Sequence, residues 1–265
     1  MSKICPLFSG SEGNSIYVGD SGGALLIDAG RSSKQIECAL HSNGLNAKNI
    51  NAIFLTHEHN DHVSGLRVFA KKYKIKVYGS YGTVEELKKK KILDDQIEYK
   101  TLSSHITDLD NFSIRSFDIS HDCAQGYGYT IKFKRSGLKV SVCSDLGFVS
   151  ELVIKSISGS DVVFLESNHD VKMLQNGTYP YFLKKRILSD KGHISNLDCS
   201  YVLPKLVYKN TTRFVLCHLS SENNTPKLAY DAAIDSLSKH GMKEGNHFEI
   251  FIAPKFNNGE LNIFL

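Results

Sequence analysis

Residues 52–62 read AIFLTHEHNDH, an apolar run followed at once by three histidines, a glutamate and an aspartate. The run from 50 to 56 is typical of a strand that is buried on both faces. A strand that ends at Thr56 would place His57 and His59 on the same side of the sheet edge, because extended residues two apart share a face. We expect these two imidazoles to bind one metal ion.

A helix that begins near Asn60 would carry Asp61 and His62 in its first turn. Side chains in that turn point back toward the same sheet edge, but at a different angle from the two preceding histidines. They suit a second ion beside the first. The spacing therefore predicts a two-metal site with ions ~3.5–4 Å apart, as in two-metal hydrolases.

Three later strand-like segments end in further metal-binding side chains. His121 follows FSIRSFDIS, Asp145 follows LKVSVCS, and His218 follows RFVLC. We expect His121 to complete the first ion, Asp145 to bridge both ions, and His218 to complete the second. A single histidine or aspartate at a strand end is more often a turn or cap residue, but their joint occurrence with the 57–62 cluster favours metal binding.

Strand-like and helix-like segments alternate along the whole chain. Many of the strands follow one another too closely for helical crossovers, which favours two mixed sheets with outer helices, of α/β (α+β) class, over one parallel sheet. With no linker or low-complexity tract, we predict a single domain over 1–265. The expected strands are 3–8, 14–19, 23–30, 50–56, 77–79, 112–119, 128–134, 138–145, 161–167, 213–219 and 248–253, and the expected helices are 33–44, 65–74, 83–91, 147–158, 179–189, 195–208 and 225–240.

The composition is that of an ordinary globular protein. The chain has 265 residues, of which 41% are hydrophobic and 23% charged, and no stretch approaches the ~20 apolar residues that a membrane span requires. The N-terminal stretch lacks the pattern of a secretory signal. Because there is neither a signal nor an apolar span, we expect a cytoplasmic location with no membrane partner. The six cysteines form no CxxC pair, so we expect reduced, mostly buried thiols. The oligomeric state is not predicted.

The motif HxHxDH at residues 57–62, with the three later strand-end ligands in order, resembles the metallo-β-lactamase fold superfamily. The resemblance runs from LLIDAG at 25–30 to the strand that precedes His218. It implies a four-layer αββα sandwich of two mixed sheets, with the metals at the open edge between them. It also implies that Asp28 orders the metal-ligand loop.

Several segments are similar to the YycJ/WalJ subgroup, relatives of tRNase Z and RNase J. The diagnostic ones are ESNHD, YPYFLKKRILSDKGHISN and CHLSSENNTPKLA. Only 72 residues (146–217) separate two of the expected ligands, which leaves no room for the large inserted domain of RNase J. Five prolines in all provide no candidate for the Gly- and Pro-rich arm of tRNase Z, and the C-terminal tail has no room for the helical domain of glyoxalase II.

Charge favours a phosphodiester substrate. Two divalent cations, two aspartates and a hydroxide sum to +1, and a basic run lies nearby in the sequence. The expected substrate-binding residues are Asn168, Lys184, Lys185 and Arg186, and the expected catalytic residues are Asp61, His193, Glu166 and His169. The resemblance places His193 where related nucleases have a proton-donating histidine, with Glu166 or His169 holding its tautomer. The alternatives for these residues are a helix cap for His193, a surface turn for His169 and a turn-holding role for Asn168.

The sequence therefore predicts a two-metal nuclease, an exonuclease on single-stranded or nicked DNA, with RNA as the nearest alternative. The family resemblance implies 5′-to-3′ polarity. A small-molecule hydrolase such as a cyclic-nucleotide phosphodiesterase would use the same metals in a closed pocket. A non-catalytic regulatory module is disfavoured, because a structural site needs no open position and rarely two adjacent ions. The donor set suits zinc or manganese, with iron as a further candidate.

Overall fold

The computed structural model describes residues 1–102 and 105–265. The chain forms two compact units. Unit 1 contains Met1–His105, Cys123–Tyr127 and Ala253–Leu265, and unit 2 contains Ile106–Asp122 and Gly128–Ile252. The single domain over 1–265 stays a prediction, and each unit is described by itself.

Unit 1 is built on a seven-stranded mixed sheet with the strand order β14-β1-β2-β3-β4-β5-β6. Neighbours are antiparallel from β14 to β3 and parallel from β3 to β6. The strands are β1 (Lys3–Phe8), β2 (Ser15–Asp20), β3 (Gly23–Ile27), β4 (Ile50–Phe54), β5 (Lys76–Gly79), β6 (Tyr99–Thr101) and β14 (Ile263–Phe264).

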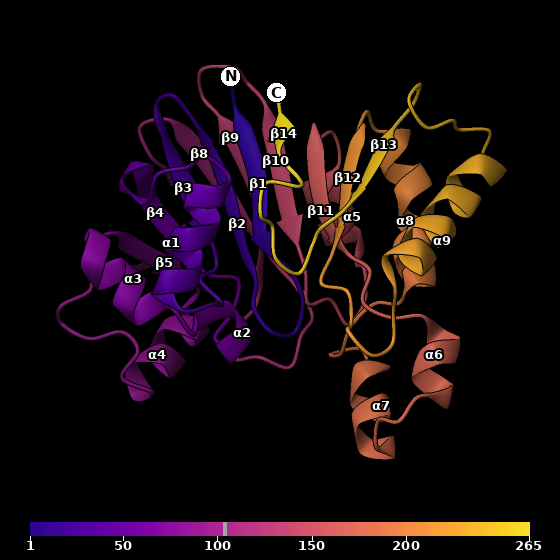
Figure 1. The fold of residues 1–265 in the computed structure, drawn as a ribbon, viewed down its shortest axis with the longest axis horizontal. Helices are drawn as coiled ribbons and strands as arrows, with labels where there is room; N and C mark the ends of the chain where they lie inside the picture. The colour runs from indigo at the N-terminus through magenta and orange to yellow at the C-terminus, as the bar shows by residue number, and fades with distance from the viewer. Residues whose placement is uncertain (103–104) are drawn as a thin grey trace. The chain divides into compact units, whose positions relative to one another are not determined.

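Helices cover one face of the unit 1 sheet (Figure 1). Apolar side chains of α1, α3 and α4 pack with alternate residues of the strands, for example Ile36 with Leu26 and Ile53 in one buried cluster. Ser32 starts α1 with a reciprocal capping box, which satisfies backbone groups that the first turn leaves open. The helical elements are α1 (Ser33–Ser42), η1 (Ala47–Asn49), α2 (Asn60–Val63), α3 (Leu66–Tyr73) and α4 (Tyr81–Lys89).

Unit 2 has a second mixed sheet of seven strands, in the order β13-β12-β11-β10-β9-β8-β7. The four strands from β10 to β13 are parallel, so their carboxyl ends meet at one edge of the sheet. The strands are β7 (Ile106–Asp108), β8 (Phe112–Asp118), β9 (Tyr127–Phe133), β10 (Lys139–Cys143), β11 (Val162–Glu166), β12 (Arg213–Cys217) and β13 (Glu249–Ile252).

Three helices of unit 2, α5, α8 and α9, pack on one face of this sheet around a buried cluster that includes Leu165, Leu203 and Phe214. Two short helices, α6 and α7, lie beyond the carboxyl ends of the parallel strands (Figure 1). The helices are α5 (Glu151–Ile157), α6 (Val171–Asn176), α7 (Tyr181–Ile187), α8 (Asn196–Val207) and α9 (Pro226–Lys239).

The observed elements confirm the predicted two mixed sheets with helices. Each expected strand and helix is present within a few residues of its predicted bounds. The elements that the sequence did not indicate are short: η1, β6, β7, α6 and β14. Four of the cysteines (Cys5, Cys143, Cys199 and Cys217) are buried. Within the described ranges, no helix is long and apolar enough to cross a membrane.

Candidate metal centre

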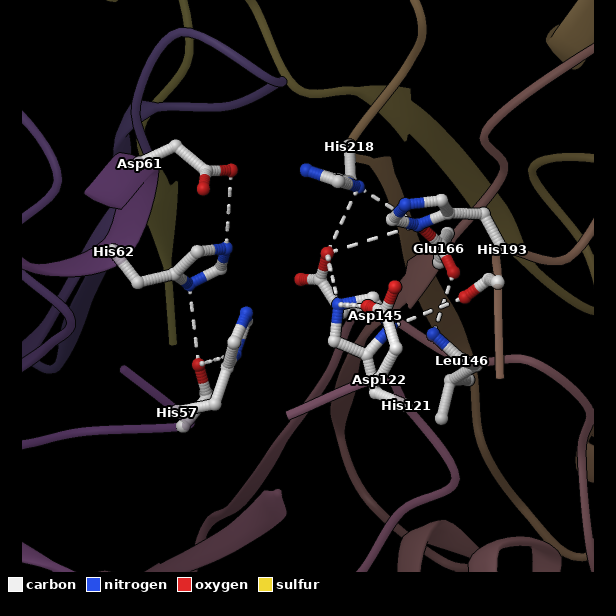
Figure 2. Close-up of polar contacts among 12 residues, drawn as sticks. His57, Asp61, His62, His121, Asp122, Asp145, Leu146, Glu166, His193 and His218 are labelled. Carbon is white, nitrogen blue, oxygen red and sulfur yellow. Dashed lines mark hydrogen bonds and ion pairs between the residues drawn. The ribbon is translucent and has the colours of Figure 1, made fainter. Parts of the chain in front are cut away.

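The first set of candidate ligands lies in unit 1, between the end of β4 and α2. His57 is fully buried, and its ring centroid lies 4.6 Å from that of His59 and 4.1 Å from that of His62. The Nε2 atom of His62 lies 3.4 Å from Oδ2 of Asp61, and the two side chains point toward one another (Figure 2). The predicted HxHxDH residues are therefore together in space.

Asp28 orients this set from the end of β3. Its carboxylate accepts hydrogen bonds from the backbone N–H of Thr56 at 2.8 Å and from the Thr56 hydroxyl at 2.7 Å, and it lies 2.8 Å from Nδ1 of His62. Burial raises the pKa of Asp28, and the bonds from His62 and Thr56 act against that rise. Because Nδ1 of His62 bonds the carboxylate, Nε2 is the atom that can bind a metal, the usual arrangement around a metal-binding histidine.

Asn14 and Gly30 fix the backbone of the ligand loop. The backbone N–H of Asn14 donates to the carbonyl of Asp61 at 2.7 Å, and the N–H of Gly30 donates to the carbonyl of Asn14 at 2.9 Å. A Cβ atom at Gly30 would lie 1.7 Å from the Asp61 carbonyl oxygen, so only glycine fits there. Sequence reasoning missed both residues, because their contacts join segments that lie 16 to 47 positions apart.

Glu58, which the family motif leaves variable, is buried here. Its carboxylate accepts a hydrogen bond of 2.7 Å from the backbone N–H of Ala124. The strand segment that precedes it also bonds this region, since the N–H of Tyr127 donates to the Thr56 carbonyl at 2.9 Å. Glu58 therefore positions the 123–127 segment and does not act as a ligand of the set.

The second set lies in unit 2, at the carboxyl edge of its parallel strands. Asp145 and His218 follow β10 and β12, and both have positive φ angles, 58° and 56°. Nδ1 of His121 donates to the carbonyl of Gly192 at 3.2 Å, which turns Nε2 toward Asp145, 3.9 Å from its Oδ1. Burial lowers the pKa of His121 and so favours the neutral imidazole, the form that binds metals.

Glu166, the last residue of β11, is the centre of this second set (Figure 2). Its Oε1 lies 2.8 Å from Nδ1 of both His193 and His218, and its Oε2 accepts from the backbone N–H of Leu146 at 2.7 Å. Burial acts to raise the pKa of Glu166, but the two histidines outweigh it and the pKa is lowered. An ionised carboxylate can only accept, so both Nδ1 atoms carry protons and both Nε2 atoms face away from Glu166.

His193 lies just before α8, where its ring keeps part of its surface exposed. Its Nδ1 is 3.7 Å from Oδ1 of Asp145. Asp145, Glu166, His193 and His218 each offer an atom within 4.8 Å of the others. The sequence left open which neighbour would hold the His193 tautomer; in the structure the hydrogen bond is to Glu166.

His169 lies in the loop after β11, with 1% of its surface exposed. Within the described part of the chain, neither ring nitrogen has a hydrogen-bond partner. Burial lowers the pKa of this histidine. It is a buried residue and not a surface turn residue, but no bond ties its ring to His193.

Asn168 braces His218. Its side-chain amide donates to the His218 carbonyl at 2.9 Å, and its own carbonyl accepts from Ser220 at 2.8 Å and from the side chain of Asn224 at 3.0 Å. These bonds hold the turn after β12 in the strained backbone conformation of His218. The geometry therefore gives Asn168 the turn-holding role; phosphate binding stays a prediction.

The basic run on α7 is partly engaged within the protein. Lys184 Nζ donates to the carbonyls of Gln175 and Gly177 at 2.8 and 2.7 Å. The Arg186 guanidinium forms a bidentate salt bridge with the Asp122 carboxylate, with a distance of 3.0 Å between Nη2 and Oδ1. Lys185 is exposed. The three predicted substrate-binding residues therefore do not form one uniform basic face.

Comparison with known proteins identifies the family of this chain. A model of the metallo-beta-lactamase superfamily matches residues 9–121. Exodeoxyribonuclease YycJ of Bacillus anthracis is 36% identical over 247 residues, 92% of this chain and 92% of that protein. Exodeoxyribonuclease WalJ of Streptococcus pneumoniae serotype 2 is 33% identical over 255 residues, 94% of this chain and 93% of that protein. The chain belongs to the YycJ/WalJ family of the metallo-beta-lactamase superfamily.

The crystal structure of YhfI from Bacillus subtilis, described as a metallo-beta-lactamase fold protein, has the same fold as this YycJ/WalJ-family chain. Its TM-score is 0.74 at 15% identity, over 99% of this chain and 98% of that one. At this identity the likeness shows the fold alone. Family and fold together make the chain a metal-dependent hydrolase.

The YycJ/WalJ fold implies divalent metal ions, and the donors present in each set fit them. In unit 1, Nε2 of His62 and Oδ2 of Asp61 are electron-rich atoms only 3.4 Å apart. The side-chain amide nitrogen of Asn14 lies 3.0 Å from that Nε2 and 3.2 Å from that Oδ2, so this one hydrogen-bond donor is within reach of both atoms. A cation would satisfy the same two lone pairs more strongly. In unit 2, neutral imidazoles and carboxylates are the donors that zinc, manganese and iron accept.

Proposed function

We propose that the chain is a two-metal nuclease that degrades single-stranded or nicked DNA from the 5′ end. The single observation that carries this proposal is the pair of relatives, each more than 30% identical over more than nine-tenths of the chain, whose names are exodeoxyribonuclease. The proposed location is the cytoplasm. Zinc or manganese is the proposed metal.

We assign the seven predicted ligands to two ions, in the arrangement that family membership implies. His57, His59 and His121 would hold the first ion, Asp61, His62 and His218 would hold the second, and Asp145 is the proposed shared ligand. The orientation of the ligand side chains supports the assignment. Asp28 holds His62, Gly192 holds His121 and Glu166 holds His218, so in each ring Nδ1 is engaged and Nε2 is the ligand atom.

Divalent ions in such a site supply Lewis acidity and a nucleophile at neutral pH. The chain itself supplies the proton that the leaving oxygen requires. His193 keeps one proton on Nδ1, bonded to ionised Glu166. Its Nε2 faces away from Glu166 and is the atom proposed to give a proton to the leaving group. His193 is the proposed general acid and Glu166 is a positioning residue.

Helix α7 supports a single-stranded substrate. Tyr181 and Phe182 are exposed by 81% and 73%, which is unusual for aromatic side chains, and Lys185 is exposed on the same short helix. Aromatic faces that stack bases, beside cations that contact phosphates, are how proteins bind single strands without reading sequence. A cyclic-nucleotide substrate would not require this exposed pair.

The test is metal-dependent cleavage of end-labelled strands. Purified protein with added Mn²⁺ or Zn²⁺ should shorten a 5′-phosphorylated single strand one nucleotide at a time from its 5′ end. The same protein should leave a cyclic nucleotide intact. Cleavage of the cyclic nucleotide with no effect on strands would contradict the nuclease proposal, and RNA cleavage in preference to DNA would correct its substrate.

Asp145→Ala provides the matching test of the metal assignment. Removal of the proposed bridging carboxylate leaves two cations ~4 Å apart with less negative charge between them, so we expect loss of bound metal and nearly all activity. Elemental analysis of the variant measures the first effect directly. Asp161→Ala is the control, because Asp161 lies at the opposite end of the unit 2 strands. Two full equivalents of metal in Asp145→Ala would contradict the bridging role.

A further inference from the structure

A basic pocket lies on the unit 2 sheet at the end opposite to the metal ligands. Its volume is about 460 Å³, and its lining includes four cationic side chains: Arg115, Lys132, Lys139 and Lys155. Among the described residues that line it, none is acidic. Neither the metal ligands nor the proposed reaction uses this pocket.

Three adjacent strands and one helix bring these cations together. Arg115 lies on β8, Lys132 near the end of β9, and Lys139 at the start of β10, where it pairs in register with Lys132. Lys155 comes from α5, which packs on this face of the sheet. The remaining length of β10, from Lys139 to Cys143, separates the pocket from the carboxyl edge by ~13 Å at ~3.3 Å per residue.

The pocket cations have little acidic compensation. Several basic side chains elsewhere pair with carboxylates, as Lys71 does with Asp94 and Lys76 with Glu98. In the part of the chain that the structure describes, the four pocket cations form no salt bridge, although Asp161 accepts from the backbone N–H of Lys139 at 2.7 Å and its charge partly offsets that of Lys139. Four cationic side chains that face one cavity repel one another and attract an anion.

The repulsion between the cations affects Lys139. Its Nζ donates to the carbonyl of Ser158 at 2.6 Å, and the side chain is only partly exposed. Burial, and then the charge of Arg115, lower the pKa of Lys139. A bound anion would remove that repulsion, whereas an empty pocket leaves it in place.

The size and lining of the pocket limit the class of ligand that it can bind. The volume is within the range of small-molecule sites and is much larger than a phosphate ion needs. Besides the cations, it is lined by the exposed apolar side chain of Leu152 and by Thr130 and Ser156, whose hydroxyls donate to the carbonyls of Ser156 and Leu152. This combination fits a doubly charged group attached to an organic body with its own apolar surface.

We propose that the pocket is a binding site for a small phosphomonoester of about nucleotide size. The dianionic phosphate lies among Arg115, Lys132, Lys139 and Lys155, and the organic part lies toward Leu152. The site belongs to unit 2 and does not depend on the proposed nuclease activity.

Isothermal titration of chelator-treated protein with dAMP, and separately with inorganic phosphate, tests this site without metal. The pocket variant Arg115→Ala/Lys132→Ala/Lys155→Ala leaves Lys139 and its bond to Ser158 in place. Its matched control, Lys34→Ala/Lys48→Ala/Lys243→Ala, removes the same charge from exposed lysines outside the pocket.

We expect wild-type and control proteins to bind one equivalent of dAMP, more tightly than phosphate, and the pocket variant to bind it at least about tenfold more weakly, because charge-assisted contacts are lost. Equal affinity of the pocket variant and the control, or no binding by the wild type, would overturn the proposal. A circular dichroism melt matched to that of the control shows that the variant is folded.

A second arm separates a small ligand from a passing strand. Lys155 also borders a neighbouring depression that is lined by Lys205 and Lys209. The alternative ligand is therefore a nucleic-acid single strand that follows this side of α5. Titration with a ten-nucleotide single strand measures this directly. If the pocket variant loses affinity for the strand and keeps its affinity for dAMP, the small-ligand site is wrong and the pocket is part of a strand path.

Discussion

At the scale of single residues, the site depends on strained backbone at the candidate ligands. Asp145, His218 and the supporting Asp28 all have φ angles near +60°. This left-handed backbone conformation costs an L-amino acid roughly 1–2 kcal/mol. Buried hydrogen bonds hold two of them there, since Asn168 donates to the His218 carbonyl and Thr56 donates to the Asp28 carboxylate. Strain that persists at three such residues is characteristic of functional sites. The sequence predicted which residues gather but contained no signal for these φ angles.

His193→Ala tests the proton donor. Because His193 is proposed to act on the leaving group and not on the metals, we expect metal content to be kept while kcat falls by roughly 10²–10⁴, the usual range for general acid catalysis. A substrate with a nitrophenolate leaving group, which needs no proton, should recover most of the rate. His193 lies close to Asp145 and His218 in the ligand set, so the metal content of the variant decides its role. Loss of an ion would show that His193 is a metal ligand and not the proton donor.

Glu166→Gln is the companion variant for the same role. The amide cannot accept from the Leu146 N–H and both histidines at once, so one buried donor loses its partner. We expect a smaller loss of kcat than in His193→Ala together with weaker metal binding, because His218 is released as well. A variant with full activity and full metal content would show that Glu166 does not position either ring.

At the scale of elements, α7 separates structural cations from candidate substrate contacts. The basic run was predicted as one substrate-binding group, but Lys184 caps the backbone after α6 and Arg186 pairs with Asp122. These partners come from segments that are remote in sequence or from backbone carbonyls, so composition could not distinguish them from the exposed Lys185. The exposed aromatics Tyr181 and Phe182 gave no periodic signal in so short a helix.

Lys185→Ala should therefore change strand binding without changing stability. Each single-strand phosphate contact releases counterions, so removal of one should flatten the log–log salt dependence of binding by ~0.7. Filter binding of a labelled strand across a salt series provides the slope. Lys172→Ala, an exposed lysine on α6, is the control, and hydrolysis of a small generic phosphodiester should be unaffected. An unchanged slope would leave Lys185 as an ordinary solvated residue.

At the scale of the whole molecule, the two sheets were predictable because long buried strands carry their own signal. β4 and β11 are nearly continuous apolar runs; the first proposed ligands follow β4, and β11 ends in Glu166, which positions two histidines. The three-residue strands β6 and β7 have exposed or half-buried side chains, and only pairing with a neighbour makes them strands. These two strands form only through tertiary pairing, so no local sequence pattern predicts them. The same holds for Asn14 and Gly30, whose role depends on contact with the Asp61 loop.

Metal removal tests the assembly of the site at this scale. Binding to the folded state alone stabilises it by about 2.7 kcal/mol at a metal concentration of 100 Kd, so chelation should lower Tm by roughly 5–10 °C for a chain of this size. The proposed ligands come from both units. Hydrogen exchange followed by mass spectrometry should therefore show faster exchange after chelation in the 56–62 segment of unit 1 and in the 143–147 and 217–220 segments of unit 2.

Asp145→Ala in the presence of metal separates joint from independent binding. If the ions need ligands from both units, this unit 2 substitution should also speed exchange in the unit 1 segment 56–62, nearly as much as chelation does. The segment at α9, which holds none of the proposed ligands, should exchange as in the wild type and provides the internal reference. If the change were confined to unit 2, each ligand set would bind its ion alone, and the bridging role of Asp145 would be lost together with the two-metal mechanism.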